Sequence, residues 1–211
     1  MPRRFRADKP VAFALCAVPL AWISGRTLGF AELSLGPNPV EALIHSLGSW
    51  GLRLLLLTLC VRPVAMLLHQ PRLMRLRRTI GLFAFAYLVL HLLAWLVIDR
   101  ALDLPGIVAD IAKRPYVTVG FTALLMLLPL AVTSTDAWMR RLGGRWQTLH
   151  RLVYPAAMLG CLHFLWLVKA DWREPALYLA LLTVLMAWRW RRRSLSRATA
   201  AVPRAPTRCP G

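Results

Sequence analysis

Acidic residues are scarce in this chain of 211 residues, where nine aspartates and glutamates stand against 27 lysines and arginines. The resulting net charge of +18 would suit a nucleic-acid-binding protein. The arginines, however, cluster at the ends of apolar runs, and no nucleic-acid-binding motif is present. Basic clusters in such places set the orientation of membrane proteins. We therefore expect a membrane lipid environment and no nucleic-acid partner.

Motifs for structural metals and for dinucleotides are also missing. The four cysteines form no CxxC pair, so we expect neither a disulfide framework nor a zinc site, and we interpret them as small apolar residues. They are Cys16, Cys60, Cys161 and Cys209. No GxGxxG follows a strand, and only about twenty residues follow the last apolar run, so we expect no nicotinamide- or FAD-binding domain.

Long apolar runs are what the chain has in abundance, since 58% of its residues are hydrophobic and a soluble domain would be nearer half. The runs are about as long as a helix must be to cross a bilayer. This pattern predicts an all-α integral membrane protein with a bundle of six transmembrane helices. The predicted spans are residues 11–30, 43–65, 80–98, 116–133, 150–168 and 175–188.

The distribution of arginines orients these spans. By the positive-inside rule, the basic segments are cytoplasmic, which places both termini inside; they are the N-terminus and residues 62–78, 140–151 and 189–197. The less basic links are then outside, at residues 30–42, 99–115 and 169–174. We divide the chain into a cytoplasmic N-terminus (1–10), a transmembrane domain (11–192) and a disordered, basic cytoplasmic tail (193–211).

Thr133 or Ser134 is expected to cap a short surface helix in the fourth link, which Gly143-Gly144 would end.

Two histidines within the apolar runs are the first candidates for chemistry. His91 lies about eleven residues into the third span and His163 about thirteen into the fifth, so both reach the outer half of the bilayer. Two imidazoles that face each other across a helix pair can ligate a haem iron. We predict His91 and His163 as axial ligands of a haem between the third and fifth helices. On the residues alone, a packing role for His91 stays open.

A second pair is expected nearer the cytoplasm. Arg77 precedes His91 by fourteen residues, close to four helical turns, and so reaches the depth of His150. This pair predicts an inner haem or cofactor site with His150 as a metal ligand. Arginine is a poor iron ligand because it stays protonated. Pro155 must kink or re-phase the helix for His150 and His163 to face one way; otherwise His150 lies at the headgroup interface.

Four further arginines are candidate contacts for phosphate or propionate groups, because a guanidinium pairs well with both. They are Arg53, Arg75, Arg78 and Arg145. Arg53 lies within the second span, where it can snorkel, pair with a propionate or meet a lipid headgroup. Trp95 and Trp166 follow the outer histidines and are interpreted either as packing around a haem or as an interfacial aromatic belt.

Three segments give the chain a specific resemblance: RRTIGL…HLLAW, then KRPYVTVG, then LGGRWQTLHRLVY…LHFLW. Together they resemble the MsrQ (YedZ) family over roughly residues 10–192. Members are haem-binding membrane subunits of the bacterial MsrPQ methionine sulfoxide reductase system, and are similar in turn to the ferric-reductase-like transmembrane domain. That superfamily carries two histidines on each of two helices. Here His91, His150 and His163 match, but Arg77 stands where the fourth histidine would be.

The resemblance implies a function that composition does not show. It implies an inner-membrane protein that binds haem b and FMN and passes electrons from the quinone pool to MsrP, a periplasmic molybdenum-dependent methionine sulfoxide reductase. The catalytic chemistry is then on the partner, and the donor is a quinol or a cytoplasmic flavin reductase. One haem is implied, between His91 and His163, with a second in doubt. The alternatives are a stand-alone ferric or cupric reductase and a cofactor-free transporter or scaffold.

Overall fold

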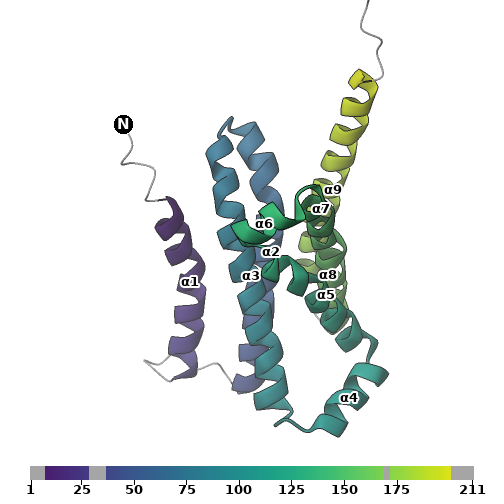
Figure 1. The fold of residues 1–211 in the computed structure, drawn as a ribbon. Helices are drawn as coiled ribbons and strands as arrows, with labels where there is room; N and C mark the ends of the chain where they lie inside the picture. Colours follow the sequence, from purple (N-terminus) through teal and green to yellow (C-terminus); the bar gives the residue numbers. More distant parts are fainter. Residues whose placement is uncertain (1–7, 29–36, 169–171, 201–211) are drawn as a thin grey trace, which may run out of the picture.

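The computed structural model describes residues 8–28, 37–168 and 172–200, and within them it is all helical (Figure 1). The longer helices are α1 (Asp8–Thr27), α2 (Pro39–Leu67), α3 (Leu76–Leu93), α5 (Pro115–Val132), α8 (Val153–Leu167) and α9 (Arg173–Ala200). Shorter helices join them: α4 (Leu104–Lys113), α6 (Asp136–Leu142) and α7 (Gly144–Leu149). Three irregular turns complete the set: η2 (Pro71–Arg75), the π-helical η3 (Ala94–Asp99) and the 3₁₀ turn η4 (His150–Leu152).

Among the described residues, four helical segments are long and apolar enough to cross a membrane: Lys9–Thr27, Pro39–Leu67, Pro71–Asp99 and Pro115–Val132. They coincide with the first four predicted spans, so the chain is a multi-pass membrane protein. Helix α8, with 15 residues, and helix α9, whose second half is rich in arginine, are not among them. The count of six spans and the cytoplasmic termini stay predictions.

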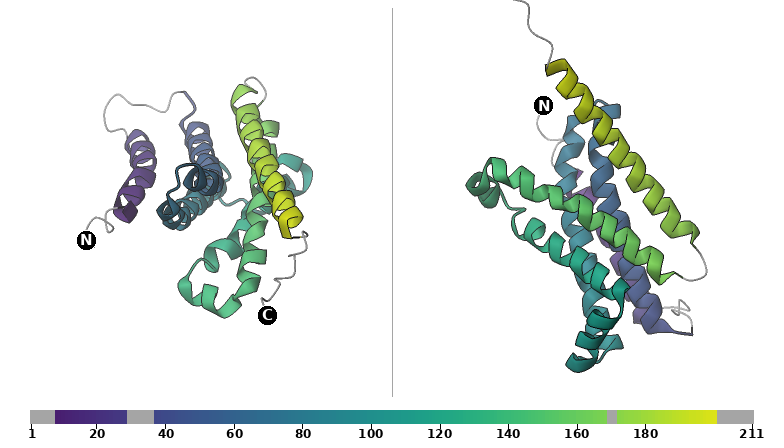
Figure 2. Two further views of the ribbon diagram at one scale, coloured as in Figure 1. Left: turned by 90° about the horizontal axis from the view of Figure 1, so that it is seen from above. Right: turned by 90° about the vertical axis from the view of Figure 1, so that its right-hand side faces the viewer.

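Two helical hairpins form the body of the molecule. Helix α2 packs along α3, and α5 packs along α8. Helix α1 flanks the first hairpin and α9 flanks the second, so that the groups lie in a row when seen from above (Figure 2). The α2–α3 connection lies at one end of the molecule and α4 at the other (Figure 1).

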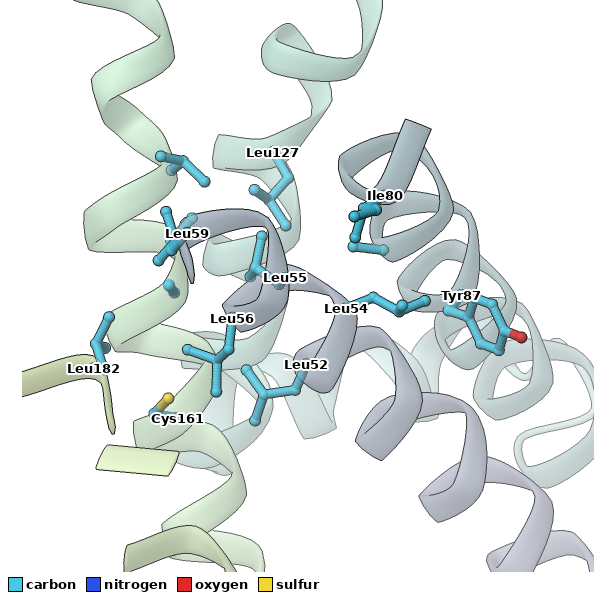
Figure 3. Packing of buried hydrophobic residues seen from close by; sticks show 14 of the residues in the cluster. Leu52, Leu54, Leu55, Leu56, Leu59, Ile80, Tyr87, Leu127, Cys161 and Leu182 are labelled. Carbon is cyan, nitrogen blue, oxygen red and sulfur yellow. The ribbon is translucent and has the colours of Figure 1, made fainter. Parts of the chain in front are cut away.

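Helix α2 is central because its leucines pack against α3 on one side and against α8 and α9 on the other. Leu52 and Leu56 lie on the side of Cys161 and Leu182, which belong to α8 and α9, whereas Leu54 points toward Tyr87 of α3 (Figure 3). All of them are buried. A continuous leucine run therefore makes one helix the shared core of the molecule, with apolar surface buried on opposite faces.

Cys16 and Cys161 are buried free thiols and Cys60 is half-buried, as expected for small apolar residues; Cys209 lies outside the described residues. The Tyr87 hydroxyl donates a hydrogen bond of 2.9 Å to the carbonyl of Cys16, which ties α1 to α3.

Several local predictions need correction. The link at 99–115 contains helix α4, because proline is favourable in a first helical turn and Pro105 occupies that position. The surface helix before Gly143 is present as α6, but its cap is Thr135, whose hydroxyl accepts from the Trp138 backbone N–H. Helix α9 continues past residue 192 to Ala200, through residues that mostly favour helix, and the division of the chain into domains stays a prediction. Residues 201–211 lie outside the described residues.

Candidate functional site

A cavity of about 350 Å³ lies between the two hairpins, within the usual range of ligand pockets. Its walls come from α2, α3, α5 and α8, and are mostly apolar. Both His91 of α3 and His163 of α8 line it. The structure therefore brings together, in one cavity, the two histidines that were predicted to lie at the same depth.

The distance between the two imidazole rings bears on whether they could bind one metal ion together. Their centroids are 6.3 Å apart and their planes are inclined by 77°. A metal–imidazole nitrogen bond is about 2.0 Å long, and a ring centre lies roughly 1.1 Å beyond the nitrogen, so two rings that ligate one ion from opposite sides have centres roughly 6.2 Å apart. The observed spacing fits one metal ion between the rings.

Both histidines are oriented by a backbone carbonyl on the neighbouring helix. His91 Nδ1 lies 2.9 Å from the Ile44 carbonyl oxygen on α2, and His163 Nδ1 lies 2.7 Å from the Tyr116 carbonyl oxygen on α5. A carbonyl only accepts, so each Nδ1 carries the proton. This leaves the Nε2 lone pair of each ring free, and metal-ligating histidines commonly donate their other ring N–H to a carbonyl in this way.

A glycine makes room for each imidazole. A Cβ atom at Gly120 would lie 2.7 Å from His163 Nδ1, and a Cβ at Gly48 would lie 3.0 Å from His91 Nδ1. Any side chain at these positions would push the ring away from its carbonyl partner, since interiors are close-packed. The two glycines thus form a cradle on each side of the cavity.

These glycines were not predicted as site residues, although the sequence carries a signal for them. His91 follows Ile44 by 47 residues and Gly48 by 43, and His163 follows Tyr116 and Gly120 by the same intervals. The two hairpins therefore build the same device: a carbonyl, a glycine one turn later and a histidine on the partner helix. Equal spacing at a shift of 72 residues is a repeat that a search for single motifs does not find.

The inner pair is arranged differently. Arg77 lies near enough for its charge to act on the His150 imidazole. His150, however, stacks on Trp146 with ring centroids 3.9 Å apart, and its Nδ1 donates to the Trp146 carbonyl of its own helix at 3.2 Å. No second histidine faces it among the described residues.

The distortion predicted at Pro155 is present as the 3₁₀ turn η4, just before the proline. On an ideal helix His150 and His163 point about 140° apart, and three residues of 3₁₀ helix change this by about 60°. The two side chains still do not share a face, and His150 does not line the cavity of His163.

The other candidate arginines lie away from that cavity. Arg53 donates to the Tyr178 hydroxyl at 2.7 Å and to Glu174 at 2.5 Å, and its guanidinium lies over the Trp50 ring. This pairing with α9 was not among its three predicted environments. Arg78 pairs with Asp136 of α6 at 2.7 Å. Arg75 and Arg145 are exposed.

The two tryptophans separate in the structure. Trp95 lines the cavity, as expected for a side chain that packs around a bound group. Trp166 is 52% exposed and lies outside the cavity lining, as expected for an interfacial residue.

Comparison with known proteins bears on this arrangement. Residues 47–161 match the family model of the ferric reductase like transmembrane component. A protein of Caulobacter vibrioides named protein-methionine-sulfoxide reductase heme-binding subunit MsrQ is 50% identical over 187 residues, which cover 87% of this chain and 88% of the relative. The chain belongs to the MsrQ family.

Other MsrQ proteins give the same result. The MsrQ of Rhodospirillum rubrum is 49% identical over 88% of each chain. That of Xanthomonas axonopodis pv. citri is 44% identical over 97% of this chain and 95% of the relative. These relatives are named heme-binding subunits of a methionine sulfoxide reductase, and the resemblance seen in the sequence motifs is confirmed.

Proposed function

We propose that this chain is the haem-binding, electron-transferring membrane subunit of a methionine sulfoxide reductase system, with a haem b held between α3 and α8. His91 and His163 would be its axial ligands. The observation that carries the proposal is the ring pair itself: 6.3 Å between centroids, with each Nδ1 hydrogen-bonded to a carbonyl and each Nε2 left to ligate.

The donor set suits a haem better than a bare metal ion. Among the residues that the structure describes, no three histidine, cysteine or acidic side chains come together. Protein sites for bare metal ions use three or four such ligands. A haem iron already has four porphyrin nitrogens, so it needs only the two axial ligands that this cavity offers. The apolar walls would suit the macrocycle.

A haem iron with two axial imidazoles supplies one-electron transfer, at a potential set by its ligands and surroundings. The chain's own residues do the rest. Ile44 and Tyr116 fix the orientation of the two imidazole rings through their carbonyls. These hydrogen bonds would hold the rings in place in both the oxidised and the reduced state of the site. Gly48 and Gly120 let the rings approach those carbonyls. The apolar walls of α2 and α5 exclude water from the cavity.

The proposed topology keeps six spans with both termini in the cytoplasm. Helices α7 and α8 follow each other through η4 without a break, so residues 144–167 form a helical run of about 36 Å, enough to cross the hydrocarbon core. Residues 175–188 of α9 would be the sixth span. The proposed location is the bacterial inner membrane, because the basic segments then lie on the cytoplasmic side.

The proposed donor is the quinone pool, or a cytoplasmic flavin reductase, and the proposed acceptor is a periplasmic molybdoenzyme of the MsrP type. The support is the family's part in methionine sulfoxide reduction. An FMN is also proposed, and its candidate phosphate contacts are the cytoplasmic residues Arg75, Arg77 and Arg145. Arg78 is a weaker candidate, because Asp136 already occupies it.

The test uses purified, chemically reduced protein with and without an MsrP-type partner. We expect the reduced Soret and α bands to decay to the oxidised form only when both the partner and methionine sulfoxide are added. Rapid oxidation by a ferric chelate with no response to the partner would favour a stand-alone ferric reductase, an activity suggested by the name of the matching family model. Absence of any Soret band would point to a cofactor-free transporter or scaffold.

A further inference from the structure

Two arginines that were not predicted as site residues line the mouth of the histidine cavity, although one of them, Arg114, belongs to the KRPYVTVG segment. Arg100 follows η3, and Arg114 precedes α5. Both belong to the same cavity wall as His91 and His163. Both also pair with one carboxylate, that of Asp110 on α4: Arg100 Nη2 contacts Oδ2, and Arg114 Nε lies 3.0 Å from Oδ1.

This cluster is incompletely satisfied where it is buried. Arg100 Nε and Asp110 Oδ2 lack a well-formed hydrogen bond, although both atoms are buried. The nearest acceptor to Arg100 Nε is an Asp99 carboxylate oxygen at 3.4 Å. A buried donor without a good acceptor is costly, and the natural acceptor for a guanidinium fork is a carboxylate. Arg100 therefore has one buried N–H that the protein bonds only weakly.

The backbone directs Arg100 into this position. The backbone N–H of Arg100 bonds to the Trp95 carbonyl at 3.0 Å, five residues earlier, which is the π-helical pattern. In a regular α-helix Asp99 would lie one turn above Trp95; the wider turn places Arg100 there, with its guanidinium over the Trp95 ring. Ala101 and Leu102 then adopt positive φ angles, and strain of this kind is typical of ligand clamps.

Tyr116 joins the second arginine to the second histidine. Its hydroxyl accepts a hydrogen bond of 3.1 Å from Arg114 Nη1, which raises the pKa of that guanidinium, and its carbonyl accepts the one from His163. The mouth and the ligand pair are therefore held by the same residue at the start of α5.

We propose that Arg100 and Arg114 bind the two propionate carboxylates of the haem, with Asp110 holding both guanidiniums in place before the haem enters. This inference rests on the proposed haem site. It replaces Arg53, Arg75, Arg78 and Arg145 as propionate contacts, since none of those lines the cavity. The other charged groups near the mouth are Asp99 and Asp110, which pair with these arginines, and the Glu41–His45 pair on α2.

The test compares two cofactors that differ only in these carboxylates. Full-length protein produced without haem is loaded with haem b or with its dimethyl ester, in which both carboxylates are neutral. The measured quantity is the rate of haem loss to an excess of a haem-scavenging protein. Arg100→Gln and Arg114→Gln should each accelerate the loss of haem b about tenfold or more, and leave the loss of the ester unchanged within about twofold.

Arg141→Gln is the matched control, because Arg141 lies over a tryptophan ring as Arg100 does but does not line the cavity; it should affect neither cofactor. Arg114→Lys should restore part of the retention of haem b. Equal acceleration for both cofactors, or none for either, would overturn the proposal. Wild-type protein that takes up neither cofactor would instead refute the haem site itself, so the two failures are distinguishable.

Discussion

The regions around His163 and around His150 hold two histidines of the η4–α8 segment in different ways. His163 lies opposite a second histidine, donates to another helix and borders a cavity. His150 lies within range of the Arg77 charge, donates to the Trp146 carbonyl four residues earlier and stacks on the Trp146 ring. If His91 and His163 hold a haem as proposed, a histidine at membrane depth is prepared for ligation by the group that bonds its other nitrogen and by the group that stands opposite.

The largest expected effect comes from adding a side chain at Gly120, the glycine beside His163. Gly120→Ala places a Cβ 2.7 Å from His163 Nδ1, which is held by the Tyr116 carbonyl and has little room to move. Overpacking of this kind costs about 1–3 kcal/mol. We expect haem content in purified membranes to fall about tenfold or more, and to fall less for Gly48→Ala, where the gap is 3.0 Å.

Gly160→Ala is the control for this pair, because Gly160 lines the same cavity but a Cβ there meets only Leu52, at an ordinary 3.4 Å. It should keep the haem. Equal loss in all three glycine variants would show general disruption of the bundle and not a histidine cradle.

A smaller effect is expected from the ion pair between Arg53 of α2 and Glu174 of α9. The Tyr178 hydroxyl, and after it Arg53, lowers the pKa of Glu174 at the start of α9. A carboxylate with a depressed folded-state pKa stabilises the fold above its unfolded pKa of about 4.3, and this stabilisation is lost as the pH falls further. Because the pair is about 40% exposed, we expect about 0–1 kcal/mol.

Glu174→Gln should therefore lower the melting temperature by about 2–4 °C at most at pH 7, and by less at pH 4. Scanning fluorimetry in detergent measures both, and haem content should stay unchanged. Glu41→Gln, which removes a carboxylate 3.8 Å from His45, is the control. A larger loss at pH 4 than at pH 7 would contradict the stated direction.

The smallest effect is expected at the inner pair. His150→Ala and Arg77→Ala should leave the ratio of haem to protein at the wild-type value, since neither side chain lines the cavity. A pyridine haemochrome assay measures this ratio. A ratio that falls by half in His150→Ala would mean that the inner histidine holds a second haem.

More of the His91–His163 site than of the Arg77–His150 site could be predicted from the sequence. Counting residues into the spans was enough to pair His91 with His163, because depth in a straight helix follows from 1.5 Å per residue. Counting also paired Arg77 with His150. Counting does not show how each imidazole is held: the Nδ1 atoms of His91 and His163 bond to carbonyls of other helices, and that of His150 bonds to a carbonyl four residues earlier.

The arginines at the mouth of the cavity could not be predicted as site residues for a different reason. Arg100 and Arg114 occupy a link to which no helix was assigned from the sequence. Their position depends on a π-helical turn and on α4, which brings Asp110 between them. The π-helical turn leaves no hydrophobic period in the sequence, whereas α4 leaves the i, i+3, i+4, i+7 pattern of Leu104, Ile107, Val108 and Ile111. The arginines predicted as propionate contacts stand out by charge alone, and they lie elsewhere.

The most direct test of the central claim is the haem-to-protein ratio, with a reduced-minus-oxidised spectrum, of His91→Ala and His163→Ala. If the two rings hold one haem between them, each variant loses nearly all of its Soret absorption while the chain is still inserted and folded. If either variant keeps the full complement of haem with an unchanged spectrum, His91 and His163 are not the ligands.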